Sequence, residues 1–85
     1  MNIMRKFTEE EKMILNSFEQ VESDYCWIAR DVDNKLYVYN RKPKTLLRQG
    51  CYYVDGDDAK MLRLEPFENI FKKVTWVRGP IQFRK

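Results

Sequence analysis

The sequence predicts an α+β fold, in which an N-terminal helix packs on a curved antiparallel sheet of four or five strands. Three observations predict it: a helix-capping pattern near residue 8, a β-hairpin within Trp27–Pro43, and a concentration of aromatic and β-branched residues after position 25. The chain has 85 residues, the size of one small domain, and its 44% hydrophobic content is typical of a globular protein. The expected division is an N-terminal tail (1–7), a helix (8–23) and a sheet (25–83) that includes a short helix near 66–71.

The capping pattern consists of Thr8 followed by three glutamates. The Thr8 hydroxyl can accept a hydrogen bond from the amide three residues on, and the Glu11 carboxylate can reach back to the Thr8 amide. Apolar residues then recur at helical spacing, at Ile14, Phe18 and Val21. These features predict a helix over about 9–22.

The hairpin is predicted as two strands, Tyr25–Val32 and Lys35–Asn40, joined by a two-residue turn at Asp33-Asn34. This register predicts that one face carries Trp27, Ala29, Leu36 and Val38. The other face is predicted to carry Ile28, Tyr37 and Tyr39 beside Arg30 and Lys35. We expect one face to pack on the helix. The tyrosine face is then either covered by a loop or left for a partner.

In the rest of the chain, proline and glycine residues predict loops, and short apolar stretches predict strands. Pro43 cannot donate to a strand ladder, which predicts a basic loop over Arg41–Gly50. The further elements expected are strands at Cys51–Val54, Val74–Val77 and Ile81–Phe83 (the last at the sheet edge), a strand or one helical turn at Lys60–Leu64, and a brief helix at Pro66–Phe71.

Composition excludes several kinds of chemistry. The chain has no histidine, which rules out Cys-His and Ser-His-Asp nucleophile systems and removes the commonest zinc ligand. Asp31 and Asp33 flank the hairpin turn and are expected to shape it or to pair with a base. Asp55, Asp57 and Asp58 lack the rest of a calcium loop. We therefore expect no enzyme, cofactor or metal site, although a small metal-dependent hydrolase using Asp31 or Asp57 stays a third reading.

Targeting features point to the cytoplasm. The N-terminus has no apolar segment of the signal-peptide type, no run approaches a membrane span, and two cysteines make no disulfide framework. The net charge of +3 permits nucleic acid or an acidic partner and requires neither.

A binding surface is the best functional candidate in the sequence. Cations beside aromatic rings suit single-stranded nucleic acid, while tyrosine and arginine also anchor protein interfaces. The acidic turn at 55–58 would repel a phosphate backbone, which favours a protein partner. The candidate residues are Tyr37, Tyr39, Arg41, Lys42, Lys44, Arg48, Tyr52 and Tyr53.

Two segments of the chain form a recognisable pattern. The first contains Ile28-Ala29-Arg30-Asp31, Asp33, Leu36-Tyr37-Val38-Tyr39 and Lys42-Pro43, and the closing one contains Ile70-Phe71, Val74-Thr75-Trp76 and Pro80. On these residues the chain resembles a family of short, uncharacterised phage and prophage proteins of Gram-positive bacteria. The resemblance spans Tyr25 to Ile81. Two departures are Asn34, where the family usually has glycine, and Arg78-Gly79, where it is usually acidic.

The resemblance implies a phage origin and a small α+β domain, and it transfers no catalytic residue. Together these observations predict a non-enzymatic phage accessory protein of the bacterial host cytoplasm that binds a host or phage protein, for example as an inhibitor of a host defence or replication factor. The alternative is a single-stranded nucleic-acid-binding module. A monomer and a homodimer are both compatible with the sequence, and no membrane association is expected.

Overall fold

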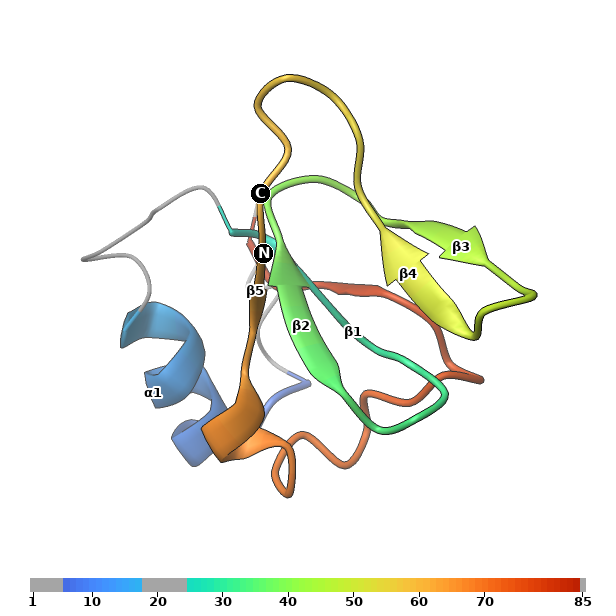
Figure 1. The fold of residues 1–85 in the computed structure, drawn as a ribbon. Coiled ribbons are helices and arrows are strands. Elements are labelled where there is room, and N and C mark those ends of the chain that lie inside the picture. The colour runs from blue at the N-terminus through green and yellow to red at the C-terminus, as the bar shows by residue number, and fades with distance from the viewer. Residues whose placement is uncertain (1–5, 18–24, 85) are drawn as a thin grey trace.

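The computed structural model describes residues 6–17 and 25–84 and confirms the α+β class (Figure 1). The chain runs from one helix through six strands, with a 3-10 turn before the last strand. In order these are α1 (Glu9–Ser17), β1 (Trp27–Arg30), β2 (Leu36–Tyr39), β3 (Lys44–Leu46), β4 (Cys51–Tyr53), β5 (Met61–Arg63), η2 (Glu65–Phe67) and β6 (Ile81–Gln82).

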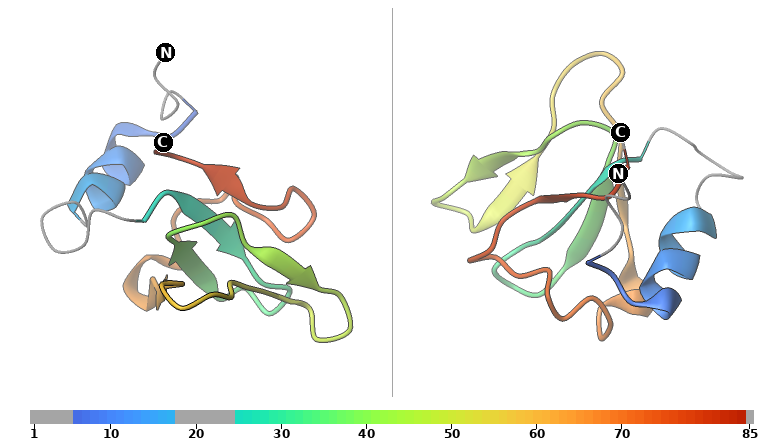
Figure 2. Two further views of the ribbon diagram at one scale, coloured as in Figure 1. Left: turned by 90° about the horizontal axis from the view of Figure 1, so that it is seen from above. Right: turned by 180° about the vertical axis from the view of Figure 1, so that it is seen from behind.

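The strands form two antiparallel sheets. The main sheet has four strands in the order β5-β2-β1-β6, so β6 lies at an edge as predicted, and β3 and β4 form a separate two-stranded sheet. Helix α1 lies on one side of the main sheet and the β3–β4 hairpin on the other, as all the ribbon views show (Figures 1 and 2). The predicted basic loop over 41–50 is therefore wrong in part, because it contains β3 and the turn into β4.

The register of the first hairpin differs from the prediction by one residue. Asp31 pairs with Lys35, Asn34 N–H donates to the Asp31 carbonyl at 3.0 Å, and Asn34 has a positive φ of 75°. The loop thus contains three residues, with Asn34 in the left-handed position that asparagine tolerates better than most residues. Because side chains alternate along a strand, a slip of one residue moves a whole set of side chains to the other face.

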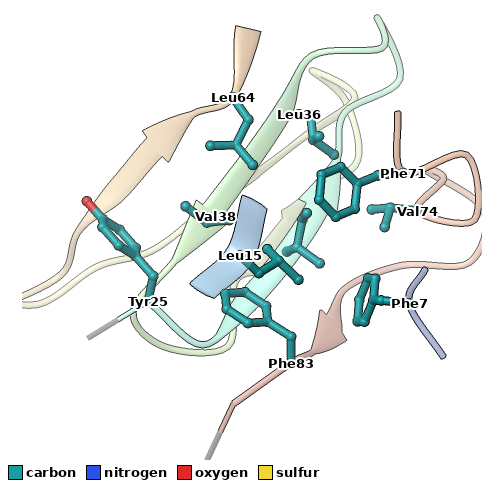
Figure 3. Close-up of a cluster of buried hydrophobic side chains, with 10 residues drawn as sticks. Phe7, Leu15, Tyr25, Leu36, Val38, Leu64, Phe71, Val74 and Phe83 are labelled. Atoms are coloured by element: carbon teal, nitrogen blue, oxygen red, sulfur yellow. The ribbon is translucent and has the colours of Figure 1, made fainter. Parts of the chain in front are cut away.

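The consequence is that Ile28 pairs with Val38 and Ala29 with Tyr37. Ile28, Leu36 and Val38 therefore face the helix, where they join a buried cluster (Figure 3). The other members of that cluster are Phe7, Leu15, Tyr25, Leu64, Phe71, Val74 and Phe83. This cluster is the main core, and it receives side chains from α1, the main sheet and the segment before β6.

The opposite face carries the tyrosines and forms a second, smaller core. Ala29, Tyr39 and Tyr52 are buried there, with Trp27 and Trp76 packed against them. The covered alternative for the tyrosine face is the one observed: the β3–β4 hairpin lies over it and Tyr52 reaches in from β4.

Helix α1 begins with the predicted capping box. Glu11 N–H donates to Thr8 Oγ1 at 3.1 Å, and Thr8 N–H donates to Glu11 Oε1 at 2.8 Å. The described part of the helix ends at Ser17, so the predictions for Phe18 and Val21 lie outside the described residues. At the helix end, Arg84 donates to the carbonyl oxygens of Leu15 and Tyr25.

Two other predicted elements differ. The predicted strand Val74–Val77 is wrong: Val74 and Thr75 belong to no strand, and residues 76–78 form a turn in which the Gly79 N–H donates to the Thr75 carbonyl at 3.1 Å. A strand needs a neighbour for its backbone groups, and here β6 takes the place beside β1. At Lys60–Leu64 the strand reading is the observed one (β5), and the brief helix predicted at Pro66–Phe71 is the 3-10 turn at Glu65–Phe67.

Candidate binding surface

The structure divides the eight predicted site residues into three groups. Tyr39 and Tyr52 are buried in the second core, which removes them from the surface. Tyr37 and Tyr53 are half-buried. The cations are exposed, but Arg48 lies at the far end of the β3–β4 hairpin from the others, which are Arg41, Lys42 and Lys44.

The cations at the near end are already engaged. Arg41 forms an ion pair with Asp58, and Lys44 Nζ lies 3.1 Å from Asp55 Oδ2, a contact that raises the pKa of Lys44. Lys42 lies over the Trp27 ring, 5.7 Å from its centroid. Asp58 and Asp55 therefore pair with two of the three cations at this end of the hairpin.

A different surface emerges where three loops meet. The turn at 31–35, the turn at 46–50 and the turn at 75–79 lie at the same end of the molecule in every ribbon view (Figures 1 and 2). We call this region the loop end. Two cations here, Arg48 and Arg78, have no ion-pair partner among the described residues.

Four aliphatic side chains of the loop end are exposed, and we call them the loop-end patch. Their exposed fractions are 58% for Val32, 37% for Leu46, 78% for Leu47 and 93% for Val77. Sequence reasoning missed this patch, because it assigned Val77 to a strand and treated 41–50 only as a source of charge. The available indication was the Leu46-Leu47 pair inside an otherwise basic stretch.

Tyr52 links the three loops through its contacts. Its N–H donates to Asp31 Oδ1 at 3.1 Å, and its hydroxyl donates to the Trp76 carbonyl at 3.3 Å. The centroids of the Tyr52 and Trp76 rings lie 5.0 Å apart. The Val32 N–H donates to the Gly50 carbonyl at 2.9 Å. These contacts join the backbones of the three loops at one end of the molecule.

Asp31 and Asp33 have structural roles. Burial raises the pKa of Asp31, while its hydrogen bond from Tyr52 acts in the opposite direction. Asp33 accepts from the Lys35 N–H at 3.1 Å, which confirms the expected turn role, and its carboxylate also lies 3.4 Å from Lys35 Nζ. Both carboxylates therefore accept backbone N–H groups, Asp31 from β4 and Asp33 within the turn.

Arg30 is a buried cation that sequence reasoning placed on the wrong face. It makes five hydrogen bonds to carbonyl oxygens, two from each terminal nitrogen and one from Nε. The acceptors are Asn34, Glu68, Ile70, Phe71 and Val74. Burial lowers the pKa of Arg30, and the charge of Glu68 opposes that shift. Arg30 therefore supplies donors to carbonyls of the segment from 68 to 74, which pairs with no strand among the described residues.

An open depression of about 480 Å³ lies beside this segment and is lined in part by Arg30, Asn34, Lys72 and Trp76. The Arg30 donors in its wall are already taken by carbonyl oxygens. Within residues 6–17 and 25–84, no three His, Cys, Asp or Glu side chains come together as a metal site. In the same ranges no helix has the length and apolar character needed to cross a membrane.

Comparison with known proteins returns no match: no family model, no curated protein and no solved structure resembles the chain significantly.

Proposed function

We propose that this protein is a non-enzymatic binding module that engages another protein through the loop-end patch. The observation that carries the proposal is the exposure of four aliphatic side chains on three loops that are tied together at one end. The resemblance to short phage proteins extends the proposal to an accessory protein of a phage or prophage, with a host or phage protein as its partner.

The distribution of exposed apolar residues supports this assignment. Single exposed apolar side chains are normal, whereas several gathered in one region mark an interaction surface. The patch residues come from three separate turns of the chain, which the fold places at one end of the molecule. Arg48 and Arg78 on the same loops add the residue type that is enriched at protein interfaces.

The hydrogen bonds that join the three loops also favour binding. A surface that is already ordered loses less conformational entropy when a partner docks. Here Tyr52 joins β4 to Asp31 in one loop and to Trp76 in another, so these connections do not depend on a partner.

The test is quantitative affinity capture from lysate of the host bacterium, comparing the full-length protein with Leu47→Asp and Val77→Asp variants. Met13→Asp is the matched control, because Met13 is 73% exposed but lies on α1, on the other side of the sheet. We expect one protein to be retained by wild type and Met13→Asp and to fall at least about tenfold with either loop variant. Equal retention by all four proteins, or no capture above background, would overturn the proposal.

A further inference from the structure

We infer that the partner contributes an extended, acidic segment that adds as a strand to the free edge of β3. This inference rests on the proposed function and specifies how the loop end would be recognised. It is carried by the orientation of the backbone at Thr45 and by the charge around it.

The outer edge of β3 is open in the described structure. Its only strand partner is β4, and its three residues, Lys44 to Leu46, are all exposed. An open strand edge presents unpaired backbone groups, which is the feature that strand addition uses.

The contacts of β4 show which β3 groups point outward. Tyr52 N–H donates to Asp31 and the Gly50 carbonyl accepts from Val32, so both groups point from β4 towards β1, away from β3. In an antiparallel pair, residues opposite each other either exchange both hydrogen bonds or direct both sets away from one another. Thr45 lies opposite Tyr52. The N–H and C=O of Thr45 therefore point to the open edge.

Side chains beside this edge define what the added strand would meet. On the face opposite Thr45, Leu46 lies across from Cys51, and Lys44 lies across from Tyr53. Leu47 and Arg48 continue the edge into the tip of the hairpin. An extended segment paired with Thr45 through its backbone would place every second side chain on the face that carries Lys44 and Leu46.

The charges select an acidic segment. Lys44 and Lys35 are paired with Asp55 and Asp33, whereas Arg48 and Arg78 have no ion-pair partner among the described residues. Asp31, the other carboxylate of these loops, is buried. The uncompensated charge at the loop end is therefore positive, which attracts carboxylates and repels a second copy of this chain presenting the same arginines.

The first experiment uses random linear peptides displayed on phage and selected on the immobilised full-length protein. We expect enriched sequences in which Asp or Glu alternates with apolar residues. Binding of a selected synthetic peptide, measured by fluorescence anisotropy, should weaken with added salt and should fall at least about fivefold in Arg48→Glu. Enriched peptides without acidic residues, or binding unchanged by Arg48→Glu, would overturn the inference.

The backbone claim is tested at Thr45. Thr45→Pro removes the outward N–H without removing a bond of the β3–β4 ladder, and Thr45→Val keeps that N–H as the control. We expect peptide binding to fall about fivefold or more in Thr45→Pro and to stay within twofold in Thr45→Val. In the wild-type protein, which avoids any folding defect of the proline variant, bound peptide should slow exchange of the Thr45 amide hydrogen at least about tenfold. Unchanged exchange would overturn strand addition.

The outcomes separate this inference from the proposed function. Loss of binding with Leu47→Asp but not with Thr45→Pro leaves a protein-binding loop end and removes strand addition. If neither variant changes binding, both the proposed function and strand addition are wrong. A further experiment measures sedimentation of the protein with phosphatidylglycerol vesicles. If no peptide is selected and the protein binds vesicles in a way that Leu47→Asp abolishes, the patch contacts a membrane surface and the inference is overturned.

Discussion

The Nε of Arg30 donates to the carbonyl oxygen of Val74 over 2.7 Å, which joins a strand of the main sheet to the irregular segment before β6. Four more hydrogen bonds from the same guanidinium reach carbonyls between 34 and 71. The planar guanidinium group has five N–H donors and can therefore serve five carbonyls at once. A lysine ammonium has three donors and would leave some of these carbonyls unpaired. Val74 and Phe71, which this segment contributes, are members of the main core.

Replacement of Arg30 should be severe. Arg30→Met removes the donor of four carbonyls, and the fifth, Phe71, keeps only its hydrogen bond from the Val74 N–H. We therefore expect a loss of about 3–5 kcal/mol in unfolding free energy, measured by urea titration. Arg63→Met is the control, since Arg63 pairs with Glu68 at an exposed position and should cost about 1 kcal/mol or less. Equal losses for the two variants would contradict a structural role for Arg30.

Asp31 should destabilise the protein at neutral pH. Because burial raises its pKa, the folded state holds the proton more tightly than the unfolded state does. The stabilisation from that proton is complete below the ordinary aspartate pKa of about 3.9 and is lost as the pH rises through the folded-state pKa. Asp31→Asn keeps an acceptor for Tyr52 without the charge. We expect a higher melting temperature than wild type at pH 7 and a smaller difference at about pH 3; a pH-independent difference would contradict this account.

Tyr39 and Tyr52 should respond in opposite ways to loss of the hydroxyl. The Tyr39 hydroxyl is buried and has no hydrogen-bond partner among the described residues, whereas Tyr52 donates to Trp76. Removal of an unsatisfied buried group is neutral or stabilising. We expect Tyr39→Phe to match or exceed wild-type stability and Tyr52→Phe to lose about 1 kcal/mol in denaturant titrations. A larger loss for Tyr39→Phe would show that its hydroxyl has a partner.

The first hairpin was predicted from local sequence in its strands but not in its register. Strand propensity and the capping pattern correctly predicted β1, β2 and the start of α1. The loop between the strands depends on a single backbone angle at Asn34, and both a two-residue and a three-residue turn suit Asp33-Asn34. That one-residue difference decided which side of the sheet received the tyrosines.

The Asn34 conformation can itself be tested. Glycine adopts a φ of 75° without steric cost, while alanine pays about 1–2 kcal/mol there. We expect Asn34→Gly to retain wild-type stability within about 1 kcal/mol and Asn34→Ala to lose about 1 kcal/mol in thermal unfolding. An alanine variant as stable as wild type would mean that the loop adopts another turn.

The candidate site was harder to predict than the fold, because it depends on contacts between distant segments. The sequence identified the cations, but it could not show that Arg41 meets Asp58 and Lys44 meets Asp55. Leu47 and Val77 are thirty residues apart in the sequence, and only the tertiary fold brings their loops together at the loop end. Exposure of aliphatic side chains likewise becomes visible only once the core is defined.

The central claim is that the loop end contacts a partner protein. Its most direct test is photocrosslinking in host cells, with p-benzoylphenylalanine in place of Leu47 in one variant and in place of Met13 in another. We predict one crosslinked partner, identified by mass spectrometry, from position 47 and none from position 13. The same products from both positions, or no product from position 47, would contradict the account.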